Sequence, residues 1–102
     1  MRFQTAPPFE SDLRRLSAGE LAVFHRVVVG EFAPACDAFV AGRAFPKRLR
    51  VKAVRGAPGI FEMTWSFSGP DGRATFEWHQ LPDGSPCVRW RRVGGHAIFA
   101  AP

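Results

Sequence analysis

The chain has 102 residues, of which 46% are hydrophobic and 23% charged, and its formal net charge is +5. This composition predicts one globular domain over residues 1–102, and it excludes a membrane span because no apolar run approaches the ~20 residues that a bilayer requires. The excess of positive charge favours an acidic partner, whether nucleic acid, an anionic membrane surface or an acidic protein.

The first twelve residues lack the apolar segment of a signal peptide, so we expect a cytoplasmic location. Cys36 and Cys87 stand alone and are expected to be free thiols. Cysteine and histidine are not clustered at zinc-site spacing, and no P-loop, nucleophile elbow or dinucleotide-binding fingerprint is present. We therefore expect no metal and no cofactor.

The N-terminal segment predicts a strand followed by a short helix. Residues 2–5 alternate between apolar and polar side chains, which is typical of an edge strand, and Pro7-Pro8 should end it. Residues 8–16 predict an amphipathic helix, because apolar side chains recur there at spacings of four and three. These apolar residues are Phe9, Leu13 and Leu16.

A second helix is predicted to begin at a capping box. Ser17 can accept a hydrogen bond from the backbone of Glu20, whose side chain can reach back to the amide of Ser17. Pro34 should kink or restart this helix, and Gly42 should end it. Its predicted apolar stripe consists of Leu21, Phe24, Val28 and Phe32.

The connector over residues 43–55 carries the densest positive charge of the chain. Part of it alternates and is predicted to be extended, and a turn at residues 56–59 follows. The connector is either a solvated surface or a contact with a phosphate backbone, which would be salt-dependent and independent of base sequence. Its basic residues are Arg43, Lys47, Arg48, Arg50, Lys52 and Arg55.

Three alternating segments occupy residues 60–67, 73–80 and 87–93. They predict a three-stranded antiparallel meander whose apolar face packs on the helices, so the fold class is α+β. The opposite face should gather polar and charged side chains. These are Glu62, Thr64, Ser66, Arg73, Thr75, Glu77, His79, Arg89 and Arg91.

Pairing of apolar side chains predicts how the strands are aligned. If the first hairpin has a four-residue loop, Trp65 opposes Phe76. In the second hairpin, Trp90 opposes Phe76 and Arg89 opposes Glu77. The Glu77–Arg89 pair is then an ion pair on a sheet surface, which contributes little to stability.

Three residues remain as candidates for chemistry. Arg73 and Arg91 face no obvious carboxylate, so their guanidinium groups are either solvated or available to bind a phosphate. His96 follows two glycines just beyond the last strand. A histidine there is suited to acid–base chemistry near neutral pH, although a lone histidine in a terminal loop is commonly incidental.

The order of these elements resembles the RelE/ParE toxin superfamily, as do the segments AVRGAPGIFEMTW, GRATFEW and CVRWRRVGGHAIF. The resemblance covers nearly the whole chain. It implies a toxin of a type II toxin–antitoxin system, neutralised by an antitoxin that is expected to be acidic and encoded adjacently. The toxin would cleave ribosome-bound mRNA without a metal ion and inhibit translation. The alternatives are a ParE-like gyrase inhibitor and a non-catalytic RNA- or protein-binding module of the same fold.

For the nuclease, the resemblance implies that Arg73 and Arg91 stabilise the phosphate and that His96 moves protons. The chain departs from the family in having no tyrosine. Phe99 stands where many members have a catalytic or stacking tyrosine, and Thr64 replaces an arginine of the first meander strand. His96 would therefore supply the acid–base group. The expected RNA-binding residues are Lys47, Arg48, Arg50, Lys52, Arg55, Arg89 and Arg92.

Overall fold

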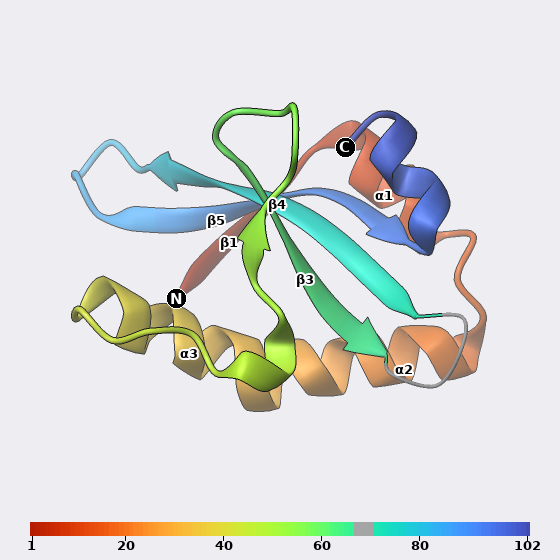
Figure 1. Ribbon diagram of the computed structural model, residues 1–102, viewed down its shortest axis with the longest axis horizontal. Coiled ribbons are helices and arrows are strands. Elements are labelled where there is room, and N and C mark those ends of the chain that lie inside the picture. Colours follow the sequence, from red (N-terminus) through yellow and green to blue (C-terminus); the bar gives the residue numbers. More distant parts are fainter. Residues whose placement is uncertain (67–70) are drawn as a thin grey trace.

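The computed structural model describes residues 1–66 and 71–102, which form an α+β fold with a five-stranded mixed sheet (Figure 1). The strands are β1 (Arg2–Thr5), β2 (Lys52–Ala53), β3 (Ile60–Ser66), β4 (Gly72–Gln80) and β5 (Pro86–Gly94). The helices are α1 (Pro7–Leu13), α2 (Ala18–Val27), the π-helix η1 (Val28–Phe32), α3 (Ala33–Val40) and the 3-10 helices η2 (Lys47–Leu49) and η3 (His96–Ala100).

The strand order is β1-β5-β4-β3-β2. The predicted antiparallel meander is confirmed as β3, β4 and β5. The predicted three-stranded sheet is nevertheless too small, because β1 adds to β5 in parallel and the short β2 adds to β3. The prediction that residues 2–5 form an edge strand is confirmed.

The capping box that begins α2 is confirmed. Ser17 Oγ accepts from the amide of Glu20 at 3.1 Å, and Glu20 Oε1 accepts from the amide of Ser17 at 2.9 Å. The predicted break near Pro34 takes the form of the π-helix η1, which leads directly into α3. Proline has no amide hydrogen and clashes with the preceding turn, so a widened turn just before it is physically reasonable.

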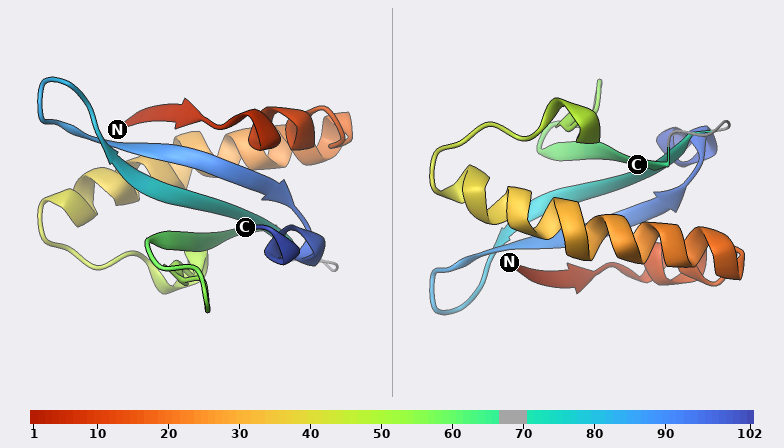
Figure 2. Two further views of the ribbon diagram at one scale, coloured as in Figure 1. Left: turned by 90° about the horizontal axis from the view of Figure 1, so that it is seen from above. Right: turned by 90° about the horizontal axis from the view of Figure 1, so that it is seen from below.

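The apolar stripe of the second helix differs from the prediction at two positions. Phe24 and Phe32 are buried as predicted, but Leu21 is 42% exposed. Val28 is only partly buried, and its neighbour Val27 is buried in its place. The core lies between these helical side chains and the apolar face of the sheet, and the ring of Phe32 lies 5.1 Å from that of Trp90. Figure 2 shows α2 and α3 covering only one face of the sheet. In the described part of the chain, no helix has the length and apolar character needed to cross a membrane.

The predicted register of the first hairpin is wrong. Phe61, not Trp65, opposes Phe76, because pairing begins only at Ser66 and Gly72 and a bulge follows it. The shift is an even number of residues, so each side chain keeps its predicted face. Phe67 and residues 68–70, on which part of the predicted hairpin depends, lie outside the described residues.

The predicted register of the second hairpin is confirmed. Trp90 opposes Phe76 and Arg89 opposes Glu77. One irregularity follows, because Phe76 opposes Trp90 whereas the preceding Thr75 opposes Arg92. Arg91 is therefore the extra residue of a bulge, which changes the direction of its side chain relative to a regular strand.

Gly72 lies directly against the indole ring of Trp65, and this contact yields a prediction. A Cβ atom added at Gly72 would lie 2.6 Å from Trp65 Cε2, in a ring held by a 2.9 Å hydrogen bond from Nε1 to the carbonyl oxygen of Arg73. We expect Gly72→Ala to lower the free energy of unfolding by about 1–3 kcal/mol in urea denaturation. Gly30→Ala is the control, because a Cβ there meets nothing within 4 Å. An unchanged stability for Gly72→Ala would contradict the close packing.

Candidate functional site: the charged face of the sheet

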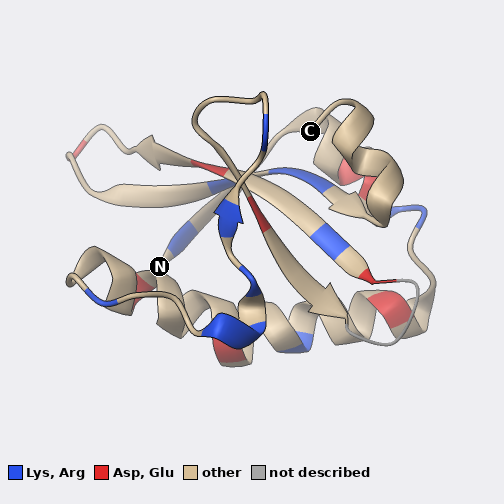
Figure 3. Ribbon diagram, in the orientation of Figure 1, with Lys and Arg blue, Asp and Glu red and all other residues tan. Residues whose placement is uncertain are grey.

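The sheet face opposite α2 and α3 carries most of the predicted site. Its residues alternate with the buried apolar set that packs on the helices, and we call it the charged face. It consists of Glu62 and Thr64 on β3, Arg73, Thr75 and Glu77 on β4, and Arg89 and Arg91 on β5. Figure 3 shows the basic and acidic residues interspersed across these strands.

Arg73 is at the centre of an ion-pair network on this face. Its Nη1 lies 3.0 Å from Glu62 Oε1, and its Nη2 lies 3.3 Å from Asp71 Oδ2. Arg50 lies 3.7 Å from the same Asp71 oxygen, and Lys52 lies 3.9 Å from Glu62 Oε1. The prediction that Arg73 faces no carboxylate is therefore wrong. The corrected register brings Glu62 diagonally across from Arg73, and Asp71 lies just before β4.

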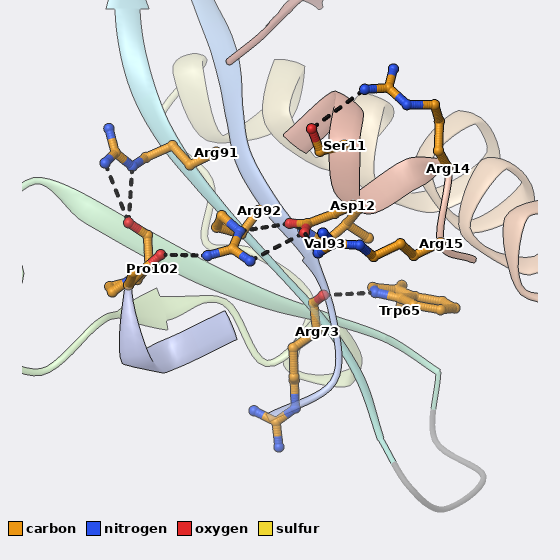
Figure 4. A network of polar contacts seen from close by, with 11 residues as sticks. Ser11, Asp12, Arg14, Arg15, Trp65, Arg73, Arg91, Arg92, Val93 and Pro102 are labelled. Atoms are coloured by element: carbon orange, nitrogen blue, oxygen red, sulfur yellow. Dashed lines mark hydrogen bonds and ion pairs between the residues drawn. The ribbon is translucent and has the colours of Figure 1, made fainter. Parts of the chain in front are cut away.

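Arg91 also has a carboxylate partner, contrary to the prediction. Its Nη1 lies 3.3 Å from Glu77 Oε2, whereas Arg89 Nε lies 3.9 Å from Glu77 Oε1. The bulge after Trp90 explains why Arg91 shares the partner predicted for Arg89. Arg91 Nε and Nη2 also donate to the carbonyl oxygen of Pro102 at 3.4 and 3.3 Å (Figure 4).

Arg92 contacts α1 rather than the carboxylates of the charged face. Its Nε donates to Asp12 Oδ2 at 2.6 Å and its Nη2 to Asp12 Oδ1 at 3.1 Å, and the amide of Val93 adds a third bond at 3.1 Å (Figure 4). Burial raises the pKa of Asp12, but the hydrogen bonds from Arg92 and Val93 outweigh it and hold the pKa below its ordinary value.

Asp12 is a residue that sequence reasoning missed. On a short amphipathic helix an aspartate is usually solvent-exposed, and only the long-range packing of α1 on β5 makes it a partner for Arg92. The same pair borders a cleft of about 680 Å³ between α1, α2 and η3, with Trp65 and Ile98 among its apolar lining.

The side chains of the basic connector form ion pairs in two parts of the molecule. Arg50 and Lys52 join the network of the charged face, whereas Arg48 Nε pairs with Glu31 of η1 at 3.2 Å. Lys47 and Arg55 are exposed and form no ion pair with residues 1–66 or 71–102. The basic connector therefore contacts both η1 and the charged face.

His96 is the first residue of η3 and is exposed. It lies at the same end of the sheet as Arg73, because Arg73 opposes Gly94 and the chain enters η3 two residues later (Figure 1). Its ring lies 5.5 Å from the ring of Phe99 in an edge-to-face arrangement. Arg91 lies further from this end of the sheet, at the bulge of β5.

The charges around this site do not cancel. Five cationic side chains share three carboxylates, which leaves an excess of positive charge on the face. An oxyanion can compete for these guanidinium groups, because it offers the same charge-assisted hydrogen bonds as a carboxylate. The cations are Arg50, Lys52, Arg73, Arg89 and Arg91, and the carboxylates are Glu62, Asp71 and Glu77.

Over the residues that the structure describes, no three His, Cys, Asp or Glu side chains are grouped so that they could hold a metal ion. Cys36 and Cys87 are buried free thiols, and burial raises the pKa of Cys36 to about 12, which makes it a poor nucleophile.

No protein family model matches the chain, and a search of curated proteins finds no match to it. The function must therefore be inferred from the residues of the charged face.

Proposed function

We propose that this protein is a RelE-like toxin of a type II toxin–antitoxin system, a metal-free endonuclease that cleaves ribosome-bound mRNA and so inhibits translation. The observation that carries the proposal is the placement of Arg73 and the exposed His96 at one end of a sheet face with excess positive charge. Such a face attracts a phosphate backbone, and a histidine beside it can transfer protons near neutral pH.

The proposed reaction needs only the arginines of the charged face and His96 of η3. The RNA 2′-hydroxyl loses its proton and attacks the adjacent phosphorus, the bond to the 5′-oxygen breaks, and that oxygen gains a proton. Arg73 and Arg91 would stabilise the charge on the phosphate by exchanging Glu62 and Glu77 for phosphate oxygens. His96 would carry the proton transfer.

The remaining basic residues would hold the RNA and the antitoxin. Lys47 and Arg55 are exposed without described ion pairs, so they suit contacts to a phosphate backbone that weaken as salt rises. Lys47→Ala combined with Arg55→Ala should lower the slope of log affinity against log salt by about 1.4 for a single-stranded RNA, as two phosphate contacts are lost. An unchanged slope would contradict this role. An acidic antitoxin would complement the same positive surface.

The test of the proposed function is induced expression followed by primer extension on ribosome-bound mRNA. We expect growth arrest and new 5′ ends within translated messages. Expression without growth arrest and without new 5′ ends would reject the toxin.

A second candidate is a non-catalytic protein of the same fold, such as a gyrase inhibitor. Each of Arg73, Arg91 and Arg92 is already paired with a carboxylate, which favours a structural role for all three. A supercoiling assay distinguishes the candidates. Inhibition of gyrase that survives loss of both Arg73 and His96 would support the non-catalytic protein.

A further inference from the structure

Two threonines of the charged face have buried hydroxyl groups without a hydrogen-bond partner in the part of the chain that the structure describes. Thr64 on β3 and Thr75 on β4 are both 0% exposed. Neither Oγ1 atom has a hydrogen-bond partner among residues 1–66 and 71–102. A buried hydroxyl without a partner lowers stability, and valine has nearly the same shape and strand propensity without that cost.

The strand register places both threonines next to Arg73 on the charged face. Thr64 opposes Arg73 and Thr75 opposes Glu62, so the four residues form a square on the charged face. The 3.0 Å ion pair from Arg73 to Glu62 runs along one diagonal of this square, and the two threonines lie on the other. Arg73 Nε is also buried and has no partner within the described residues.

Three hydrogen-bond donors without a described partner thus belong to neighbouring residues of the charged face. Each threonine hydroxyl can donate one hydrogen, and Arg73 Nε can donate another. Donors of this kind, with a positive charge at the centre, suit an oxyanion. The carboxylates beside them already accept from Nη1 and Nη2 of Arg73, so the unused donors need a different acceptor.

We propose that Thr64, Thr75 and Arg73 form an oxyanion-binding site, which opens when the Arg73 guanidinium moves from Glu62 onto the bound anion. The hydroxyls and Nε then bind oxygens of a phosphate. If the proposed function holds, that phosphate is the one being cleaved, and this part of the inference rests on that function. Thr64 would then bind the phosphate at the position where the resemblance places an arginine.

Thermal unfolding in inorganic phosphate tests the site without RNA. A ligand that binds only the folded protein raises its melting temperature, and we compare phosphate with chloride at equal ionic strength. We expect phosphate to stabilise the wild type. Thr64→Val and Thr75→Val should melt higher than the wild type in chloride, because an unpaired hydroxyl is removed, yet lose most of the shift that phosphate causes.

Three further variants keep the test decisive. Thr5→Val alters an exposed threonine of β1 and should retain the whole phosphate shift. Thr64→Ser and Thr75→Ser keep the hydroxyl and should also retain it, which covers the case in which a valine variant fails to fold. The absence of a phosphate shift in the wild type, or an equal shift in the valine variants, would overturn the site.

The test of the oxyanion-binding site and the test of the proposed nuclease can fail independently of each other. A phosphate shift that depends on the threonines, in a protein that cleaves no mRNA, would support the site and reject the nuclease. Cleavage that persists in Thr64→Val and Thr75→Val at the wild-type rate, without a phosphate shift, would reject the site and leave the nuclease. An RNA oligonucleotide that binds the wild type more tightly than these variants would identify the anion as a phosphodiester.

Discussion

His96→Ala is expected to reduce cleavage of ribosome-bound mRNA by at least about 100-fold, the usual effect of removing a general acid or base. The side chain is exposed at the start of η3, so its loss removes little packing beyond the edge of the Phe99 ring. Folding should therefore be preserved, and the loss should appear in the rate of cleavage at saturating ribosomes, measured by primer extension. The chain contains no tyrosine that could replace it.

His79→Ala is the matched control for this variant. His79 is also exposed and lies on β4, where it opposes Cys87. Arg73 lies near the opposite end of the same strand. The His79→Ala variant should cleave at the wild-type rate. If His96→Ala retains cleavage within a few-fold of the wild type, histidine is not the acid–base group and the assignment fails.

The parts of the fold that depend on local rules were predictable from the sequence. The capping box at Ser17 and Glu20 needs only four consecutive residues, and the period of two in β4 places each of its side chains on a face. The position of β1 beside β5 was not predictable, because a parallel pair depends on packing between segments far apart in the chain.

Strand alternation predicted which residues share the charged face, but not their contacts or the parts of Asp71 and Asp12. The face of Arg73 follows from strand alternation, which a shift by an even number of residues preserves, whereas Arg91 lies at the bulge of β5. Their carboxylate partners depend on bulges in β3 and β5, which interrupt the simple pairing and carry no clear signal in a single sequence. The partners of an arginine are therefore less predictable than its face.

Asp12→Asn is expected to lower the free energy of unfolding at neutral pH by about 2–3 kcal/mol, the range for losing hydrogen bonds to a buried charged group. The carboxylate side chain is 6% exposed and accepts from Arg92 and from the amide of Val93, so it joins α1 to β5. Urea denaturation measures the loss. Glu10→Gln is the control, because Glu10 is an exposed carboxylate of the same helix and should change stability by less than about 0.5 kcal/mol.

The ion pair between Asp12 and Arg92 makes the stabilisation of the fold by Asp12 depend on pH. The pKa of Asp12 in the folded protein lies below its ordinary value of 3.8, because the bonds from Arg92 and Val93 outweigh the effect of burial. A carboxyl with a lowered folded-state pKa stabilises the fold fully above its unfolded-state pKa, and this contribution is lost as the pH falls through the folded-state pKa. The difference in stability between the wild type and Asp12→Asn should therefore be constant near neutral pH and shrink below about pH 4. A difference that stays constant down to pH 2 would show that Asp12 acts through packing rather than through its charge.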